Sequence, residues 1–427
     1  GHPDFPAQER QILRGWIEGD LYRKSVDSRP ADRAFHFYDG PPFATGLPHY
    51  GHLLASITKD VVPRYWTMRG YRVERRWGWD CHGLPIENEA EQQLGLKSRR
   101  DILDYGVAKF SEFCRTLVFR YTAEWQQVIQ RLGRWVDWDS QYRTMDADFM
   151  ESVWWVFKSL WDKDLIYKGY KSLAYCPRCA TPLSNFEVNQ GYKDTQDPSI
   201  TVRFEVLDEP GVSLLAWTTT PWTLSSNMGL AVGPDVDYVR VTTTEGEQLI
   251  LARARLDTMF KKREAEVVDV QDIPVTDLIG LRYKPLFPYF ADLADEGAFR
   301  VVAADFVSTE DGSGIVHIAP GFGEEDYQLG QREGLPTVCP IDADCRFTDE
   351  VTDYAGEFVK DIDTPVIRHL RGTGQLFSEG SIEHSYPFCW RCDSPLIYRT
   401  ISTWFVRIEG ELKEKMIAAN QKIRWVP

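Results

Sequence analysis

The chain has 427 residues, of which 43% are hydrophobic and 26% are charged, a composition typical of globular proteins with a large core. Its 49 lysines and arginines face 64 aspartates and glutamates, and the formal net charge of −15 argues against non-specific coating of nucleic acid. We expect no membrane contact, because no run of about 18 apolar residues occurs and the N-terminal residues lack the order of a secretory signal.

The residues before about 190 are expected to form an α/β region. Residues 34–39 (AFHFYD) predict a short aromatic strand, and the apolar spacing after them predicts a helix from about 51 to 68. A second strand is expected in YRVERRWGW, and long amphipathic helices are expected over 101–132 and 148–165. A strand, a helix and a second strand in succession indicate a parallel sheet.

Two histidines, His49 and His52, lie at the start of the predicted helix. Residues at i and i+3 share a helix face, and the free N–H groups and dipole of the first turn favour an anion. Gly51 lets a ligand approach the backbone closely, and Tyr50 is expected to face inward. The arrangement suits nucleotide phosphates, although two unrelated surface histidines remain an alternative.

An arginine-rich stretch, RYWTMRGYRVERRW, begins within this helix. It holds five arginines interleaved with aromatic residues, a combination suited to phosphate contact and base stacking. A solvated surface explains the same pattern equally well, so the stretch alone does not decide whether RNA binds there.

The texture of the sequence changes near residue 198. From there to about 345 it consists of short β-branched runs: ITVRFEV, SLLAWTTT, DYVRVTT, EQLILA, AEVVDV, FRVVAADFV and GIVHIA. Turn residues separate these runs, which predicts an antiparallel or mixed β domain. The block lies between two CxxC pairs, an order that fits a domain inserted into another domain.

Four of the eight cysteines form those pairs, Cys176 with Cys179 and Cys389 with Cys392. Each CxxC is half of a possible tetrahedral zinc site, and four thiolates would complete it. Nothing in the sequence proves that the halves meet, and a redox pair is the competing interpretation. Cysteines without a secretory signal indicate a reducing, cytoplasmic compartment.

Four motifs in fixed order resemble the isoleucyl-tRNA synthetases, a family of class I aminoacyl-tRNA synthetases. They are PPFATGLPHYGHLL, GWDCHGLPIE, TTTPWTL and GIVHIAPGFGEEDY, and the resemblance covers essentially the whole chain. It implies a Rossmann-like α/β nucleotide-binding domain, here its first half, interrupted by a β-rich inserted editing domain. It also implies ATP, L-isoleucine and tRNA(Ile) as partners, with Mg²⁺ accompanying ATP.

The resemblance assigns roles in amino-acid activation. It implies that His49, Gly51 and His52 bind ATP, with both histidines catalytic. Gly40 and Pro41 would form the wall around the amino-acid side chain, and Asp80 would pair with the α-ammonium group. A buried ammonium group requires such an anion, although Asp80 could instead be a helix cap or a turn residue.

A second set of roles concerns hydrolysis of a wrong product. Isoleucine and valine differ by one methylene, which binding alone discriminates weakly. The resemblance implies an editing pocket in which Asp326 holds the α-ammonium group and His317 lies beside the side chain. The remaining editing residues that it implies are Trp217, Thr218, Thr219, Thr220 and Thr223, with the three consecutive threonines and Asp326 catalytic. Plain β structure and an acidic helix start are the alternatives.

The expected organisation places the N-terminal helix and first half of the catalytic domain at 1–170 and the inserted editing domain at 191–385. Zinc-binding necks at 171–190 and 386–427 would flank the insertion, and the zinc would be structural. No KxSK string occurs, so we expect a monomeric N-terminal part of a longer enzyme that is not competent for full aminoacylation. A valyl-tRNA synthetase and a stand-alone tRNA deacylase are the alternatives.

Overall fold

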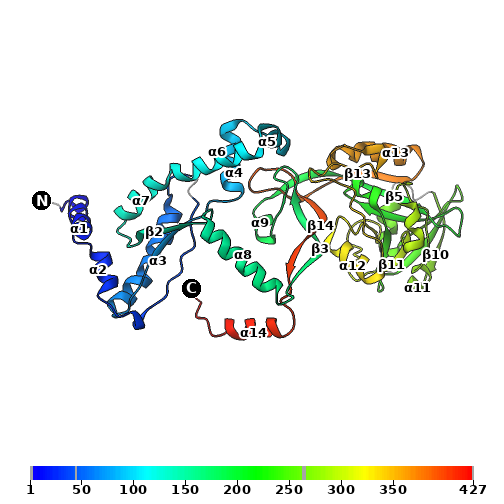
Figure 1. Cartoon of the computed structure of the whole chain (residues 1–427). Coiled ribbons are helices and arrows are strands. Elements are labelled where there is room, and N and C mark those ends of the chain that lie inside the picture. The colour runs from blue at the N-terminus through cyan, green and yellow to red at the C-terminus, as the bar shows by residue number, and fades with distance from the viewer. Residues whose placement is uncertain (1–2, 44–45, 262–265, 426–427) are drawn as a thin grey trace. The chain divides into compact units, whose positions relative to one another are not determined.

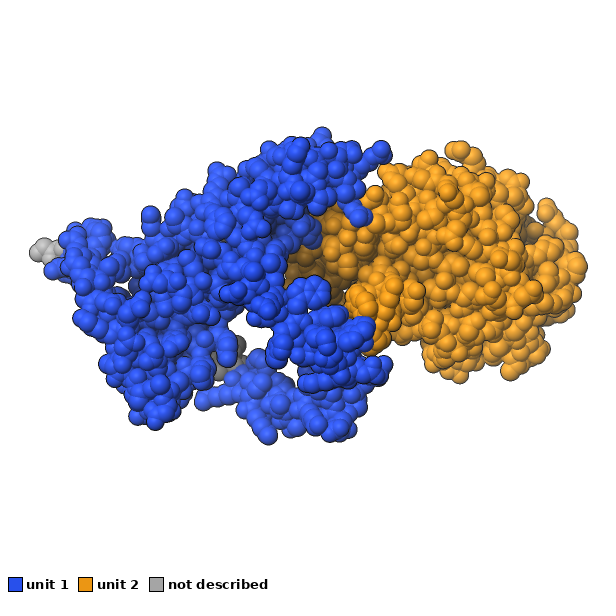
Figure 2. Space-filling model, viewed as in Figure 1, with its two compact units in different colours: residues 1–166, 406–427 blue, residues 167–405 orange. Residues whose placement is uncertain are grey.

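The computed structural model describes residues 3–43, 46–261 and 266–425. The chain divides into two compact units, which Figure 2 colours separately. Unit 1 comprises residues 1–166 and 406–427, and unit 2 comprises residues 167–405. Ala44 and Thr45, which belong to the first motif, lie outside the described residues. None of the described helices is long and apolar enough to cross a membrane.

Unit 1 is mainly helical (Figure 1). In chain order its elements are α1 (Phe5–Glu18), α2 (Leu21–Asp27), η1 (Ala31–Arg33), α3 (Tyr50–Met68), β1 (Arg76–Trp79), α4 (Leu84–Leu94), α5 (Arg99–Tyr105), α6 (Val107–Arg120), α7 (Thr122–Arg131), β2 (Asp137–Arg143), α8 (Ala147–Trp161) and α14 (Glu411–Asn420). A two-stranded parallel sheet is present, but it pairs β1 with β2, a strand that the sequence analysis does not predict, with Arg76 opposite Asp137.

Two local predictions for unit 1 are wrong. Residues 34–39 form no strand, and only Ala34 makes an isolated bridge, to Arg72. The helix expected over 101–132 is three helices, α5, α6 and α7. Gly106 interrupts the first two with a φ of 103°, a conformation that glycine adopts without strain. The predicted helix over 51–68 is confirmed as α3.

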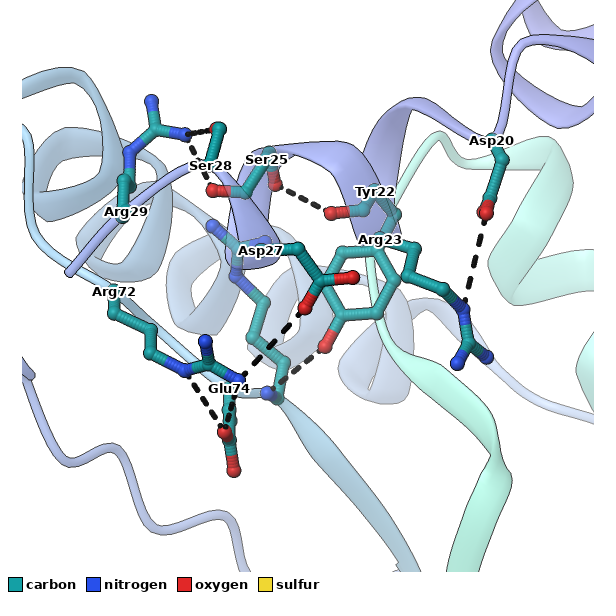
Figure 3. Close-up of polar contacts among 10 residues, drawn as sticks. Asp20, Tyr22, Arg23, Ser25, Asp27, Ser28, Arg29, Arg72 and Glu74 are labelled. Atoms are coloured by element: carbon teal, nitrogen blue, oxygen red, sulfur yellow. Dashed lines mark hydrogen bonds and ion pairs between the residues drawn. The ribbon is translucent and has the colours of Figure 1, made fainter. Parts of the chain in front are cut away.

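Helix α2 lies against the segment that leads into β1. Figure 3 shows Arg72 pointing at both Asp27 of α2 and Glu74, at 3.8 and 3.1 Å. The hydroxyl of Tyr22 accepts a hydrogen bond of 3.1 Å from the backbone N–H of Arg75. These contacts tie residues about fifty positions apart, so α2 braces the start of the parallel sheet.

A cluster of tryptophans forms the core next to β1. The rings of Trp77 and Trp79 meet edge to face at 5.5 Å, and Trp79 meets Trp125 of α7 at 5.9 Å. All three side chains are almost fully buried. Aromatic rings bury a large apolar area in edge-to-face packing, so this cluster fixes α7 beside the strand that carries the second motif.

Unit 2 is rich in strands. Its elements are β3 (Ile166–Cys176), β4 (Thr181–Pro182), α9 (Asn185–Val188), β5 (Tyr192–Glu205), β6 (Val212–Thr218), η2 (Pro221–Ser226), β7 (Gly229–Val232), β8 (Tyr238–Thr243), β9 (Gln248–Ala252), η3 (Arg253–Arg255), α10 (Leu256–Phe260), β10 (Val267–Ile273), α11 (Val275–Leu278), η5 (Ala291–Glu296), β11 (Arg300–Ala303), β12 (Ile315–Ile318), α12 (Glu324–Glu333), η6 (Thr352–Tyr354), η7 (Val359–Ile362), α13 (Asp363–Gly372), β13 (Leu376–Pro387) and β14 (Ile397–Val406). All seven runs that predict strands contain a strand.

The described strands of unit 2 form a nine-stranded mixed sheet. Its main order is β10-β8-β9-β6-β12-β7-β11, and β5 joins β6 to the long strand β13. β12 pairs parallel with β6 and antiparallel with β7. This order brings the end of the threonine-rich strand β6 beside β12, which carries His317. A separate three-stranded sheet, β14-β3-β4, holds the cysteines that follow β3.

Candidate functional site

Unit 1 contains a cavity of about 590 Å³ at the start of α3, here called the histidine cavity. Gly40, Pro41, His49 and His52 all line it, so the structure brings together four of the residues that sequence reasoning singled out. Gly51 and Asp80 are not among the described residues that line it. The backbone N–H of Asp80 nevertheless donates to the carbonyl of Pro42, a wall residue, at 2.9 Å.

The backbone of the first turn of α3 fixes which ring nitrogen of each histidine accepts a hydrogen bond. The N–H of Gly51 donates to Nδ1 of His49 at 3.1 Å, and the N–H of His49 donates to Nδ1 of His52 at 3.2 Å. Each Nδ1 is therefore an acceptor, and each neutral ring carries its hydrogen on Nε2. The rings stack at 3.7 Å. Burial, and then the neighbouring His49, lowers the pKa of His52, so this ring stays a neutral Nε2–H donor.

Tyr50, which was expected to face inward, is 90% exposed. The helix buries the side chains of Ser56, Pro63 and Thr67 instead. Ser56 and Thr67 accept hydrogen bonds from the buried Arg134 and Arg75. A pattern of apolar residues cannot predict that a polar helix face of this kind is buried.

A buried ion network supports the wall of the histidine cavity. Arg134 pairs with Asp39, and their side chains are only 4% and 7% exposed. Lys59 lies 2.5 Å from the other oxygen of Asp39, and Arg134 also donates to the hydroxyl of Ser56 at 3.1 Å. Because Asp39 immediately precedes Gly40, these contacts fix the turn that leads into the cavity. A buried carboxylate is tolerated only when it is paired in this way.

Unit 2 contains a second cavity, of about 230 Å³, here called the threonine cavity. All seven residues that the resemblance placed in an editing pocket line it: Trp217, Thr218, Thr219, Thr220, Thr223, His317 and Asp326. They come from the end of β6, from the turn that follows it, from η2, from β12 and from the first turn of α12. The sheet order explains their meeting, since β12 lies directly beside β6.

Three hydroxyls form a row along one side of this cavity. Thr218 Oγ1 lies 3.3 Å from Thr220 Oγ1, which lies 3.1 Å from Thr223 Oγ1. The backbone N–H of Thr220 donates to Thr218 Oγ1 at 3.1 Å. We call Thr218, Thr220 and Thr223 the hydroxyl row. Such a row can hydrogen-bond an ester, a ribose or a water molecule.

His317 joins the hydroxyl row to the core of the sheet. Its Nε2 lies 3.0 Å from Thr223 Oγ1, and its Nδ1 lies 2.8 Å from the side-chain nitrogen of Asn227. Burial lowers the pKa of His317 to about 3, because a low-dielectric environment disfavours the imidazolium. The ring is therefore neutral at physiological pH.

Asp326 lies in the first turn of α12 and is half-buried. Burial raises its pKa to about 7, the nearby Glu325 raises it further, and a hydrogen bond from the backbone of Ala319 opposes both. A carboxyl with this pKa is readily neutral when the cavity is empty, and it ionises when a cation binds next to it. This behaviour suits a group that meets an ammonium ion inside a confined space.

The two CxxC pairs meet in unit 2. The sulfurs of Cys176, Cys179, Cys389 and Cys392 all lie within 4.8 Å of one another, and those of Cys176 and Cys392 are 3.4 Å apart. A tetrahedral zinc ion with bonds of about 2.3 Å places its sulfurs roughly 3.8 Å apart, so the four side chains fit such an ion. Hydrogen bonds from Cys176 and Cys179 lower the pKa of the Cys389 thiol to about 6.

Sequence reasoning missed residues that support both cavities. Asp39 lies two residues before the start of the first motif, and Lys59 follows His52 by seven residues, so local spacing could have indicated both. Arg134 is 95 residues from Asp39, and Tyr283 is 56 residues from Asn227. No local pattern indicates pairings across such separations.

The comparisons with known proteins concern the chain as a whole. The family described as tRNA synthetases class I (I, L, M and V) matches residues 11–427. The chain belongs to this family, and the expected α/β class I synthetase fold is confirmed. The described residues contain both helices and strands, and most of the strands lie in unit 2.

Its relatives include isoleucine–tRNA ligases from three bacteria. The protein of Treponema denticola is 52% identical over 99% of this chain and 41% of its own length. That of Bdellovibrio bacteriovorus is 53% identical over 99% and 40%. The Chlamydia muridarum protein is 50% identical over 99% and 41%. The chain thus spans about 40% of the length of the curated relatives it matches.

One solved structure is a ternary complex of a LeuRS from Agrobacterium radiobacter K84 with tRNA and LeuAMS. It is 17% identical and covers 91% of this chain and 50% of that chain, with a TM-score of 0.36. A likeness at that level carries no argument.

Proposed function

We propose that this chain is the N-terminal part of an isoleucyl-tRNA synthetase. The whole enzyme activates isoleucine with ATP, transfers it to tRNA(Ile), and hydrolyses valyl-tRNA(Ile) in unit 2. The observation that carries the proposal is the threonine cavity, which gathers all seven predicted editing residues in a chain whose other unit has paired histidines at a helix start. The proposed location is cytoplasmic, and the proposed state is monomeric.

Activation rests on the histidine cavity. Two histidines whose Nδ1 atoms accept from the backbone leave their Nε2–H groups as hydrogen-bond donors for phosphate at a helix N-terminus, and the helix dipole adds to them. Such donors stabilise the negative charge that develops as pyrophosphate leaves the α-phosphate. Mg²⁺ bound to ATP supplies further charge compensation. Gly40 and Pro41 would face the amino-acid side chain.

The proposed editing reaction depends on a cavity that favours a cation, whereas the histidine cavity favours the negative charge of phosphate. Asp326 would ionise and pair with the α-ammonium group of the misattached amino acid, since its raised pKa falls when a cation approaches. The hydroxyl row would hold the ester end of the substrate with a water molecule. His317, fixed on the cavity wall, would limit the side chain that fits.

We also propose that the four cysteines bind a structural zinc ion. The donor set consists of four thiols, a set typical of closed structural sites. One pair begins at Cys176, the last residue of β3, and the other pair precedes β14 in the same three-stranded sheet. A zinc ion there would tie together the two segments between which the β-rich block is inserted.

The test separates the two reactions in the natural full-length protein. Isoleucine-dependent pyrophosphate exchange should be lost in His52→Ala and retained in Asp326→Ala. Deacylation of valyl-tRNA(Ile) should show the reverse pattern. Exchange that prefers valine to isoleucine would instead support a valyl-tRNA synthetase.

A stand-alone deacylase is a second candidate, because the threonine cavity is lined entirely by residues of unit 2. Binding of an isoleucyl-adenylate analogue to the 427-residue chain discriminates between the two. Binding that His52→Ala weakens supports the synthetase, whereas deacylation without any adenylate binding supports the deacylase.

A further inference from the structure

The hydroxyl row is continuous with two buried residues that the proposed editing reaction does not yet include. The side-chain amide of Asn227 contacts His317, and the hydroxyl of Tyr283 donates to Asn227 Oδ1 at 2.7 Å. Asn227 and Tyr283 are 4% and 1% exposed, and neither lines the threonine cavity. Any effect that they have on a ligand must therefore pass through His317.

The first step is the orientation of the Asn227 amide. The same nitrogen that contacts His317 lies 2.9 Å from the carbonyl oxygen of Gly229. A backbone carbonyl can only accept, so the atom beside it is the NH₂ group of Asn227. Its second hydrogen then points at His317 Nδ1, which must accept. The hydroxyl of Tyr283 completes this orientation by donating to the amide oxygen on the other side.

The second step fixes the histidine from its other end. Thr223 Oγ1 donates to the carbonyl oxygen of Thr220 at 2.7 Å, which uses its only hydrogen. The contact of 3.0 Å between Thr223 Oγ1 and His317 Nε2 therefore needs its hydrogen on the imidazole. Both ends of the ring give the same answer, the neutral tautomer with hydrogen on Nε2.

The third step follows the hydrogens along the hydroxyl row. Because Thr223 has spent its hydrogen, Thr220 must donate to Thr223 across their 3.1 Å contact. Thr220 has then spent its own hydrogen, so Thr218 donates to Thr220 across 3.3 Å. Each hydroxyl of the row therefore donates in the same direction, from Thr218 to Thr220 and from Thr220 to Thr223. Thr218 and Thr220 have no hydroxyl hydrogen left for a ligand, and only their oxygen lone pairs remain free.

We propose that Tyr283 and Asn227 are positioning residues that hold His317 as an Nε2–H imidazole. Its donation to Thr223 Oγ1 keeps the Thr223 hydroxyl on the carbonyl of Thr220, and so holds the hydroxyl row in place with Thr218 and Thr220 as hydrogen-bond acceptors for a ligand. The inference rests on the proposed editing function. Acceptors in the cavity select an O–H or N–H group. Because Asp326 is assigned the α-ammonium group, the remaining candidates are the free ribose hydroxyl and the attacking water. They do not polarise the ester carbonyl, which needs a donor.

The tautomer is measured directly in the 427-residue chain labelled with ¹⁵N-histidine. Long-range ¹H–¹⁵N correlation separates the two ring nitrogens, and the His317→Gln variant assigns the signal among the eight histidines. We expect a pyrrole-type Nε2 and a pyridine-type Nδ1 for His317. A hydrogen on Nδ1 in the unsubstituted chain would overturn the proposal whether or not the chain deacylates tRNA.

Two variants alter the row from its far end. Asn227→Asp keeps the shape but cannot donate to Nδ1, so the hydrogen should move to Nδ1 and kcat for deacylation of valyl-tRNA(Ile) should fall at least tenfold. Tyr283→Phe should give a mixture of tautomers and a fall of threefold or more. In both, KM should change less than twofold, because the residues do not contact the substrate.

The matched control is Tyr289→Phe, which removes a hydroxyl bonded to Asp353 outside the row. It should leave the His317 signal and kcat unchanged. Variants at Tyr283 and Asn227 that lower only the melting temperature, with tautomer and kcat unchanged, would show a merely structural role and contradict the proposal.

Terminal adenosines that lack the 2′- or the 3′-hydroxyl identify the group that the row accepts. If the ribose hydroxyl is the partner, one deoxy substrate should remove the sensitivity of kcat to Asn227→Asp. If water is the partner, that sensitivity should persist in both deoxy substrates. An unsubstituted chain with the expected tautomer and no deacylation would reject the proposed function alone.

Discussion

Asp326 makes the stability of unit 2 depend on pH, because burial raises the pKa of its carboxyl from 3.8 to about 7. Between these values the folded chain binds more protons than the unfolded chain. The free energy of unfolding therefore falls as pH rises from about 4 to 7. The full shift would correspond to roughly 4 kcal/mol, and the partial exposure of the side chain reduces this to roughly 3 kcal/mol.

We expect Asp326→Asn to abolish this fall. Its melting temperature should match that of the unsubstituted chain near pH 4 and exceed it above pH 7, where the aspartate would be a buried anion. Thermal unfolding at several pH values measures the difference. The exposed Glu324→Gln on the same helix serves as control, and an equal gain at pH 4 and pH 8 would argue against the raised pKa.

Arg134 carries a second prediction at the residue scale. Its removal leaves Asp39 buried with Lys59 as its remaining ionic partner, and breaking a buried ion pair costs about 3–5 kcal/mol. We expect Arg134→Met to destabilise unit 1 by about 3 kcal/mol, seen as faster amide hydrogen exchange in β1 and β2. Lys158→Met, which breaks an exposed pair with Asp162, should cost less than about 1 kcal/mol.

The residues that line the cavities could be predicted because they occur in recognisable motifs. The buried residues that hold them in position through hydrogen bonds could not be predicted. Trp217, Thr223 and Asp326 lie within or next to contiguous sequence motifs, so the sequence alone indicates them. The tautomer of His317 depends on Asn227, Gly229 and Thr220 together, and only three-dimensional proximity shows that combination. Polar contacts between distant segments leave no periodic trace in a sequence.

At the scale of elements, the strands of unit 2 were predictable because β-branched runs separated by turns have few alternatives. The boundaries of the helices were less predictable than the strands. The pattern over 101–132 is helical throughout, yet Gly106 adopts a positive φ and separates α5 from α6. The strand expected at 34–39 fails because, apart from the bridge at Ala34, these residues pair with no strand.

The four cysteines form a cluster that brings the end of β3 close to the segment before β14. We expect about one zinc ion per chain, and we expect Cys389→Ser to lose most of it, because three thiolates and a hydroxyl form a weaker donor set. Hydrogen exchange in β3 and β4 should then increase, since metal binding and local folding are coupled.

Cys339→Ser provides the matched control, because this thiol is not part of the four-sulfur cluster. It should leave the zinc content unchanged. Less than half an equivalent of zinc in the reduced, unsubstituted chain would contradict the zinc site.

At the scale of the whole molecule, each unit contains its own cavity, and the two cavities have opposite chemical preferences. The histidine cavity offers N–H donors, suited to phosphate, and the threonine cavity offers a carboxyl and hydroxyl oxygens, suited to an ammonium ion and to a hydroxyl group or water molecule next to an ester. Under the proposed function, synthesis and hydrolysis act on the same type of ester bond, and separate cavities would keep hydrolysis away from the site of synthesis.

The 427-residue chain should therefore show the two activities unequally. The threonine cavity is complete within unit 2, so we expect measurable deacylation of valyl-tRNA(Ile) that Asp326→Ala removes and His52→Ala does not. Isoleucine-dependent pyrophosphate exchange should be at least a hundredfold lower than in the natural full-length enzyme, because the chain has no KxSK string. Both rates are measured on the same preparation, with the full-length protein as reference. Exchange at the full-length rate would mean that the histidine cavity alone supplies the groups that stabilise departing pyrophosphate, and it would require these groups to be sought among residues such as Lys59 that already line it.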